Sequence, residues 1–205
     1  MDDSNTYSDG ESLFNLGLKS VEKNNLDEAR EFFLQAIAAN YVGDVYVELS
    51  ELERISGNES GYLHYVKLAA ENGHTVAQFF QGQFEYDSDN VEAAKEWWEK
   101  AASAGDTDAM AMLGNTILED PLDAADEEKA FQWLERAAEL QNIFAMRRLA
   151  EELEPEDALK LLFNAAELGD DDAVIEIARL VIGLGDISLA GKWWKRAEEL
   201  GVRKI

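Results

Sequence analysis

The sequence contains no cysteine, two prolines and two histidines among its 205 residues. Without cysteine, the chain can form neither disulfides nor thiolate metal sites. Because Pro121 and Pro155 are the only prolines, very little interrupts helix formation along the chain. The hydrophobic content of 46% and the aromatic content of 10% are too high for a disordered chain. We therefore expect an all-α protein.

The sequence also lacks the features that direct a chain to membranes or nucleic acids. It has no run of about 18 apolar residues, and its N-terminus, MDDSNTYSDGESL, is acidic where an export signal would be basic and then apolar. The 18 basic residues are outnumbered by 43 acidic ones, and a net charge of −25 repels phosphate backbones and anionic lipid. We expect a cytoplasmic protein, monomeric by default, that binds neither membranes nor nucleic acid. The acidity either keeps the surface soluble or attracts a basic partner.

No catalytic or metal-binding motif is present. The patterns G-x-G-x-x-G, G-K-[ST], H-E-x-x-H and G-x-S-x-G do not occur. His64 and His74 have no nucleophile motif beside them, and His74 is better placed to cap a helix. The acidic segment 119–128 lacks the glycine and terminal glutamate of an EF-hand, so we interpret it as a helix N-terminus capped by Asp126. We expect no enzymatic activity, cofactor or metal.

An internal repeat organises what is present, and residues 91–114 are its clearest copy. Ala94, Trp98 and Ala101 are spaced i, i+4 and i+7, which predicts one apolar stripe on a helix. Gly105 then predicts a helix end, and Asp106 or Thr107 can cap the next helix. This segment therefore predicts a helix, a tight turn and a second helix.

The same spacing recurs about every 32 residues and defines six units. The turn position is occupied in turn by Asn40, Gly73, Gly105, Gln141, Gly169 and Gly201. The corresponding repeats span about 10–41, 42–73, 74–105, 106–141, 142–169 and 170–201. In five of the six units the second helix carries small, large and small residues on one stripe, as close packing between helices requires, whereas the second unit has Tyr62 at the first of these positions. The tryptophans at the large positions, Trp97, Trp98, Trp133, Trp193 and Trp194, are accordingly interpreted as packing residues.

These repeats resemble a known superfamily. Residues 11–39 resemble a tetratricopeptide repeat, and the pattern A-x₃-W-x₂-A-A-x₂-G, which starts at Ala94 and ends at Gly105, is similar to the Sel-one-like repeat branch. The resemblance covers about residues 10–201. It implies a right-handed α-solenoid of about six antiparallel helix-turn-helix repeats, used as a protein-binding scaffold. We expect residues 1–9 to be a disordered or capping N-terminus and 10–205 to be a single domain.

In such a solenoid the first helices of the pairs line a concave face. Transferring the usual positions predicts a partner-binding row made of Phe14, Tyr46, Phe79, Gln83, Asn115, Arg147 and Arg179. In this hypothesis the aromatic residues supply contact area and the arginines bind a carboxylate of the partner. The alternative for the aromatic residues is packing between repeats. The alternative for the arginines is ion pairing with neighbours such as Glu151 or Glu176.

Two functions are compatible with these observations. The first is a non-enzymatic scaffold that binds a partner protein or peptide through its concave face. The second is an acidic inhibitor or immunity protein that neutralises a basic toxin or a nucleic-acid-acting protein through electrostatic attraction.

Overall fold

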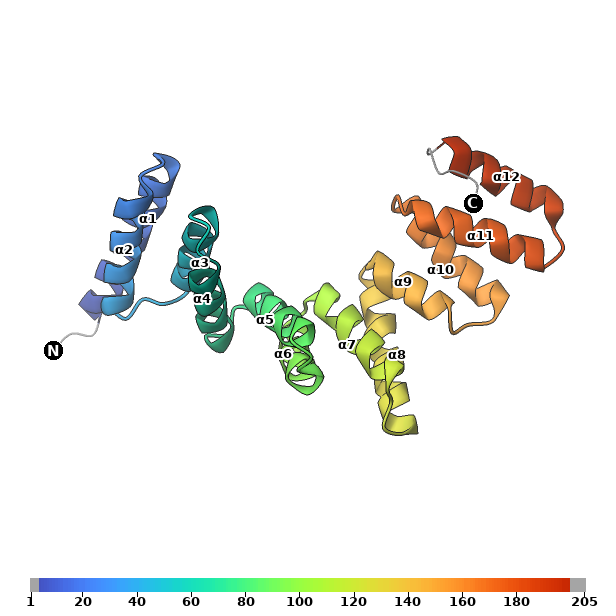
Figure 1. Ribbon diagram of the computed structural model, residues 1–205, viewed down its shortest axis with the longest axis horizontal. Coiled ribbons are helices and arrows are strands. Elements are labelled where there is room, and N and C mark those ends of the chain that lie inside the picture. The colour runs from blue at the N-terminus through green and yellow to red at the C-terminus, as the bar shows by residue number, and fades with distance from the viewer. Residues whose placement is uncertain (1–3, 200–205) are drawn as a thin grey trace. The chain divides into compact units, whose positions relative to one another are not determined.

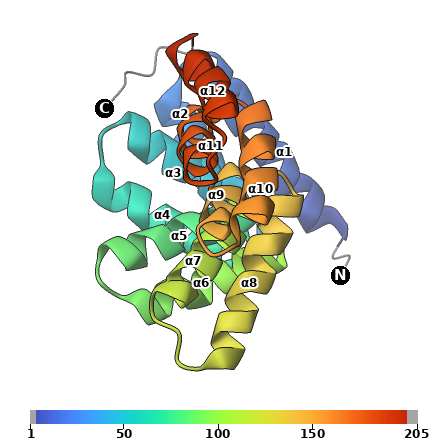
Figure 2. The same cartoon turned by 90° about the vertical axis from the view of Figure 1, so that its right-hand side faces the viewer.

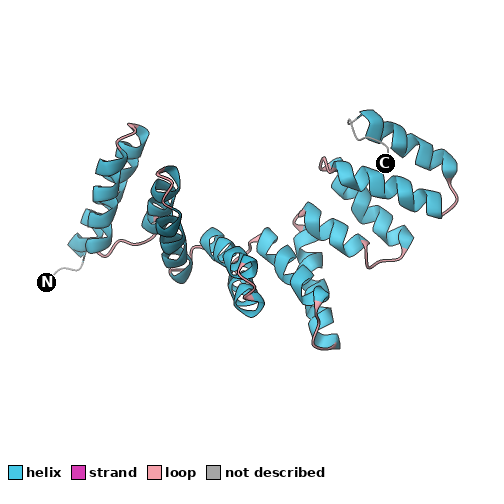
Figure 3. Cartoon of the chain, viewed as in Figure 1, coloured by secondary structure: helices cyan, strands magenta, loops and turns pink. Residues whose placement is uncertain are grey.

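In a computed structural model, the described part of the chain is built from α-helices joined by short loops, without a strand (Figure 3). The structure describes residues 4–199, including the side chains of 9–186 and 188–195. Its helices are α1 (Ser4–Glu22), α2 (Leu26–Ala38), α3 (Val45–Ile55), α4 (Glu59–Glu71), α5 (Thr75–Asp87), α6 (Val91–Ser103), α7 (Thr107–Glu119), α8 (Ala124–Glu139), α9 (Ile143–Ala150), α10 (Pro155–Glu167), α11 (Asp171–Gly183) and α12 (Ile187–Glu199).

Consecutive helices fold back on one another as hairpins, from α1 with α2 to α11 with α12 (Figures 1 and 2). The predicted all-α helical-repeat fold is thereby confirmed, with two helices in each of six repeats. The chain divides into two compact units, unit 1 (Met1–Ala104) and unit 2 (Gly105–Ile205), and each is described on its own. Residues 4–9 lie within α1, which therefore begins before the first predicted repeat.

The repeated stripe of the second helices forms the core of each hairpin. In α6, the side chains of Ala94, Trp98 and Ala101 are fully buried, and the same pattern holds in α2, α8 and α10. Trp97 and Trp133 are only half-buried, because they lie one position away from the buried stripe. Their rings are covered by the cations of Lys100 and Arg136. The packing interpretation thus describes Trp98 fully and the half-buried Trp97 and Trp133 in part.

Glycines on the first helices allow the large core residues to approach closely. A Cβ atom added to Gly82 in α5 would lie 2.5 Å from Cδ1 of Trp98 in α6. A Cβ added to Gly17 in α1 would lie 2.4 Å from Cε1 of Phe33 in α2. These distances are too short for any side chain, so glycine is required for this approach of the two helices.

The predicted turn positions adopt the left-handed backbone conformation that ends a helix. Gly73, Gly105 and Gly169 have φ values of 87°, 101° and 97°. Asn40 and Gln141 occupy the same position with φ values of 63° and 66°, although neither is a glycine. The equivalent Gly201 lies outside the described residues. The structure thus confirms that these non-glycine residues belong to the same register.

Most predicted helix caps are confirmed, and one is wrong. The Asp106 Oδ1 accepts a hydrogen bond from the Ala109 amide at 2.8 Å, and the His74 Nδ1 accepts one from the Ala77 amide at 3.3 Å. The helix after the acidic segment is capped by Asp123 instead of Asp126. Asp123 Oδ1 accepts from the Ala125 amide at 2.9 Å, because α8 begins two residues before Asp126.

A buried carboxylate joins the first two repeats. Glu53 in α3 is 5% exposed, and its side chain pairs with Arg30 of α2. It also accepts a hydrogen bond from Asn58 Nδ2 at 2.7 Å. The hydrogen bond from the Arg30 guanidinium keeps the pKa of the Glu53 carboxyl below its usual value, although burial opposes this shift.

Candidate partner-binding surface

The aromatic residues of the predicted row are largely used for packing inside unit 1. Phe14 is 9% exposed, and its ring centroid lies 5.7 Å from that of Phe33 and 5.6 Å from that of Tyr41. Tyr46 is half-buried and stacks on Tyr65 with a centroid distance of 6.5 Å. Phe14 therefore offers little surface to a partner, and Tyr46 offers part of its ring.

The two amide side chains of the row, Gln83 and Asn115, donate hydrogen bonds within their own helices. Gln83 Nε2 donates to Asp87 Oδ1 at 2.9 Å, and Asn115 Nδ2 donates to Glu119 Oε1 at 2.9 Å. Phe79 is half-buried, and its backbone carbonyl accepts a hydrogen bond from Trp98 Nε1 at 3.2 Å. These residues thus help to hold the first helices in place.

An exposed apolar stripe on α5 includes Phe80, the residue directly after Phe79. Val76, Phe80 and Phe84 are 50%, 47% and 42% exposed and recur every four residues, so they lie on one helix face. Sequence reasoning selected Phe79 and missed Phe80 and Phe84. The i, i+4, i+8 spacing of three large apolar residues was the signal that could have found them.

This stripe borders a groove between α3 and α5, with α4 at its base. The α3–α5 groove has a volume of about 330 Å³, and Val76 and Phe80 line it from α5. Its apolar floor includes Val66 and Ala69 of α4, both buried. An enclosed apolar floor beside exposed aromatic rings is typical of a site that accommodates an apolar side chain.

Carboxylates of α3 form the acidic edge of the α3–α5 groove. Glu51 is paired with Arg54 at 2.5 Å. Glu48 lines the groove and is half-buried, and its carboxylate has no hydrogen-bond or ion-pair partner among the side chains that the structure describes. Burial, together with the charges of Asp44 and Glu51, raises the pKa of Glu48. A positive charge placed at this edge would be stabilised.

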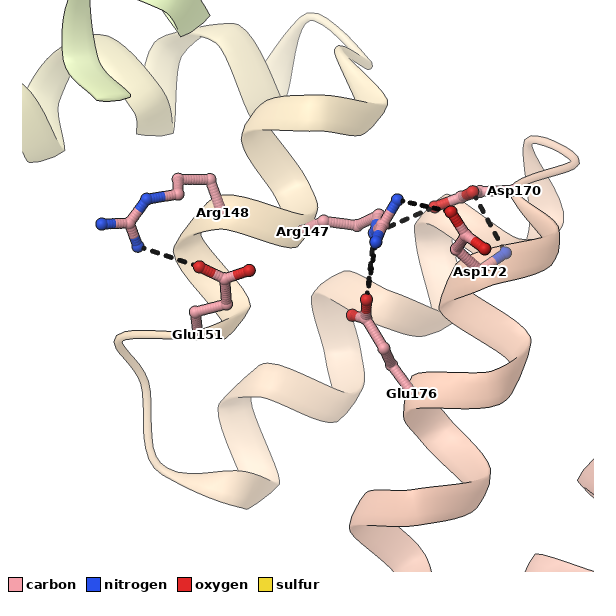
Figure 4. Close-up of polar contacts among 6 residues, drawn as sticks. All are labelled: Arg147, Arg148, Glu151, Asp170, Asp172 and Glu176. Carbon is pink, nitrogen blue, oxygen red and sulfur yellow. Dashed lines mark hydrogen bonds and ion pairs between the residues drawn. The ribbon is translucent and has the colours of Figure 1, made fainter. Parts of the chain in front are cut away.

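Two adjacent arginines of α9 dominate the polar contacts of unit 2 (Figure 4). Arg147 extends to α11, where its Nη2 lies 2.7 Å from Glu176 Oε1 and its Nη1 lies 3.1 Å from Asp172 Oδ2. Its Nε lies 3.5 Å from Asp170 Oδ2. Burial lowers the pKa of Arg147, but Glu176, Asp170 and Asp172 outweigh that effect and raise it. Arg147 therefore forms an ion pair with Glu176, as the alternative interpretation of the arginines predicted.

Arg148 extends in the opposite direction, towards α7. Its Nε donates to Asn115 Oδ1 at 2.8 Å, and its Nη1 lies 2.6 Å from Glu152 Oε1. The short helix α9 thereby connects α7, the first helix of the preceding repeat, to α11, the first helix of the following repeat. Sequence reasoning did not select Arg148. Arg179 is exposed and has no ion-pair partner in the described part of unit 2.

We predict that Arg147→Ala lowers the free energy of unfolding of unit 2 by about 1–2 kcal/mol, since it leaves three carboxylates without their cation. Urea denaturation at low and high salt measures the effect, which should shrink in high salt as the carboxylates are screened. The control is Lys160→Ala, which removes the exposed pair with Asp157 and should cost less than about 0.5 kcal/mol. Equal losses in both variants would contradict a bridging role for Arg147.

The described residues hold no group of three or more histidine, aspartate or glutamate side chains arranged for a metal ion. His74 is engaged as a helix cap, and His64 is exposed with its ring against Tyr65. Within residues 4–199, no helix combines the length and the apolar character needed to cross a membrane.

The chain belongs to the Sel1 repeat family. The family's sequence profile matches residues 10–41, 79–106, 107–142 and 183–202, which is more than half of the chain. The Sel1-repeat-containing protein YjcO of Escherichia coli K12 is 31% identical over 129 residues, covering 58% of this chain and 55% of YjcO. This chain therefore matches only about half the length of that relative.

Solved structures show the same fold. A Sel1 repeat protein from Oxalobacter formigenes aligns over 93% of this chain and 88% of its own, with a TM-score of 0.67 and 21% identity. The protective antigen c5321 of uropathogenic Escherichia coli, which displays an SLR fold, aligns over 83% of this chain and 40% of its own. Its TM-score is 0.68 and its identity 24%. Sel1 and tetratricopeptide repeats typically mediate protein–protein interactions and are generally non-catalytic scaffolds.

Proposed function

We propose that the protein is a non-enzymatic interaction module that binds a partner polypeptide through the face formed by its first helices. The observation that carries this proposal is the exposed stripe of Val76, Phe80 and Phe84 beside the α3–α5 groove. Exposed aromatic rings next to a preformed apolar cavity are typical of the centre of a protein interface. In unit 1, the proposed aromatic contact area therefore comes mainly from Phe80 and Phe84 and not from the buried Phe14.

The groove also indicates the chemistry of the partner. An apolar side chain of the partner would occupy the floor near Val66, while a lysine or arginine beside it would pair with Glu48. Such a pair compensates the half-buried carboxylate, which has no partner within the described residues. The proposed partner is therefore a segment in which a basic residue adjoins an apolar one. No protein compared above is described as a toxin inhibitor, so the alternative function gains no support.

We predict that the double variant Phe80→Ser/Phe84→Ser loses partner binding by at least about tenfold, since interface aromatics contribute more than about 1 kcal/mol each. Both side chains are substantially exposed, so helical content should remain unchanged. The protein and its variants are used to capture partners from the native cell. A partner recovered by the unmodified protein is then measured against each variant by calorimetry.

The matched control is Leu122→Ser, because Leu122 is 84% exposed, lies in the loop before α8 and does not line the groove. It should bind like the unmodified protein. A salt titration supplies a second readout, since pairing at Glu48 predicts weaker binding at high ionic strength. The proposal fails if the captured partner binds the double variant as tightly as the control.

A further inference from the structure

A second groove lies in unit 2, between the second helices α8 and α10, with the first helix α9 at its base. Two adjoining cavities of about 570 Å³ and 540 Å³ share Ala138, Glu139, Met146 and Asn164, so they form one continuous groove. Both α8 and α10 pack against α9. We call this surface the α8–α10 groove. It is formed by different helices from the proposed partner site and does not depend on that proposal.

The helix at the base of this groove, α9, is short. It has 8 residues, whereas α7, α10 and α11 have 13 each. The chain leaves α9 at Ala150 and starts α10 at Pro155, and the intervening Leu153 lines the groove while remaining 41% exposed. At the opposite end, Leu168 also lines it and is 42% exposed.

The floor of the α8–α10 groove is apolar, and both edges carry carboxylates, although Lys160 also lines the α10 edge. Met146 and Leu149 of α9 are buried and form the floor. On α8, Glu135 and Glu139 are exposed at the edge, and on α10 Glu167 is exposed at the edge. None of these three carboxylates has an ion-pair partner among the described side chains.

The dimensions and charges of this groove fit a helix. From Asp157 to Leu168 along α10 the groove extends about 16 Å, which is the length of three helical turns. Glu135 and Glu139 are one turn apart on α8, so their carboxylates match basic residues one turn apart on a partner helix. The Asp157 carboxylate is already paired with Lys160 at 2.7 Å. The unpaired charge is thus concentrated at the α8 edge and at Glu167.

We propose that the α8–α10 groove binds an amphipathic α-helix of a partner protein, with its apolar face on Met146 and Leu149 and its lysines or arginines against Glu135 and Glu139. Helix-in-groove recognition requires an apolar floor and side chains placed at i, i+3 and i+4 on the ligand, and this groove supplies the complementary surface. The interaction would occupy the second-helix side of unit 2.

The test uses the full chain and two synthetic peptides of identical composition. One is a leucine–lysine peptide of about 14 residues that forms an amphipathic helix with lysines beside its apolar face, and the other is its scrambled sequence. Binding is followed by fluorescence anisotropy at about 0.15 M salt, where long-range attraction is screened. We expect the amphipathic peptide to bind at least about tenfold more tightly than the scrambled one.

Two charge-reversal variants separate the groove from the general acidity of the protein. Glu135→Lys/Glu139→Lys should weaken binding of the amphipathic peptide by at least about tenfold. The control Glu31→Lys/Glu71→Lys makes the same change in net charge at exposed positions of unit 1 and should change binding less than about twofold. Equal weakening in both variants, equal binding of the two peptides, or no binding would each overturn the proposal. Circular dichroism confirms that the variants retain their helical content.

Discussion

Replacing Trp98 by alanine should lower the free energy of unfolding of unit 1 by about 3–5 kcal/mol, the range for deleting a large buried side chain. Trp98 has no exposed surface, and its ring centroid lies 5.5 Å from that of Tyr86. Its Nε1 donates a hydrogen bond to the Phe79 carbonyl at 3.2 Å. The substitution therefore creates a cavity between α5 and α6 and removes a hydrogen bond that connects them.

Trp97 provides the matched control, since it is the same residue type on the same helix, one position earlier. It is half-buried, and its ring is covered by Lys100 at 3.8 Å from the centroid. Trp97→Ala should therefore cost about 1 kcal/mol, in keeping with partial burial. Urea denaturation followed by circular dichroism measures both variants. Comparable losses would show that the hairpin core is not centred on Trp98.

The close approach of Gly82 adds a coupling test to the same prediction. Gly82→Ala alone should be destabilising, because the new methyl group would lie 2.5 Å from the Trp98 ring. In the Trp98→Ala background that methyl group enters the cavity, so the same substitution should cost much less. A double-mutant cycle should give a coupling of at least about 1 kcal/mol. Additive effects would contradict direct contact between the two positions.

The sequence contained enough information to predict the helical hairpins and their order. Residues at i, i+4 and i+7 must share one face of a helix, so Ala94, Trp98 and Ala101 predicted a buried stripe whatever the arrangement of other helices. The turn register was likewise local. The spacing aligned Asn40 with the glycines, and the structure gives it the same left-handed backbone.

The cap of α8 depended on a feature that the repeat does not encode. The loop before α8 has four residues, whereas the loops before α2, α4, α6 and α12 have three, so the distance from the preceding helix could not show where α8 begins. Asp123 and Asp126 are both suitable cap residues. The structure selects Asp123, whose Oδ1 accepts from the amides of Ala125 and Asp126.

The binding surface could be predicted less well, because it depends on how neighbouring helices are rotated. One residue along a helix changes the side-chain direction by about 100°. Choosing Phe79 instead of Phe80 therefore moves the candidate from an exposed position to a half-buried one. For Arg147, the sequence allowed two interpretations, binding of a partner's carboxylate or an ion pair with a neighbour such as Glu176. Only the arrangement of α9 and α11 shows that Glu176 is within reach.

Each of the two grooves is lined in part by helices that the family profile does not match. The family profile leaves out residues 42–78 and 143–182. The first of these segments contains α3 and α4, and the second contains α9 and α10. Each groove therefore combines helices outside the family match with a helix inside it, since Phe80 and Glu135 lie in matched segments.

Replacing Arg30 by alanine should lower the free energy of unfolding of unit 1 by about 2–3 kcal/mol at neutral pH, because Glu53 then remains buried without its cation. The figure is below that for a fully buried pair, since about a third of the Arg30 side chain is exposed. Asn58 still donates to the carboxylate, but one neutral donor cannot compensate its charge. The contact between α2 and α3 would be the part weakened.

The loss of unfolding free energy in Arg30→Ala should depend on pH. In the unmodified protein Arg30 lowers the pKa of Glu53 in the folded state, so the pair contributes stability above the unfolded pKa of about 4.3. That contribution disappears as pH falls through the lower folded pKa. In Arg30→Ala, burial instead raises the folded pKa of Glu53, so protonation on acidification relieves the destabilisation. The stability difference between the two proteins should therefore narrow as pH falls from 7 towards about 4.

Urea denaturation across this pH range, on the unmodified protein and four variants, tests the argument. In the Glu53→Gln background no buried charge remains, so adding Arg30→Ala should cost less than about 1 kcal/mol and show little pH dependence. Arg54→Ala removes an exposed pair with Glu51 and should cost less than about 0.5 kcal/mol. A pH-independent loss in Arg30→Ala would mean that Arg30 stabilises the hairpin junction by packing alone. A loss that narrows on acidification, and only when Glu53 is present, identifies the buried carboxylate as its cause.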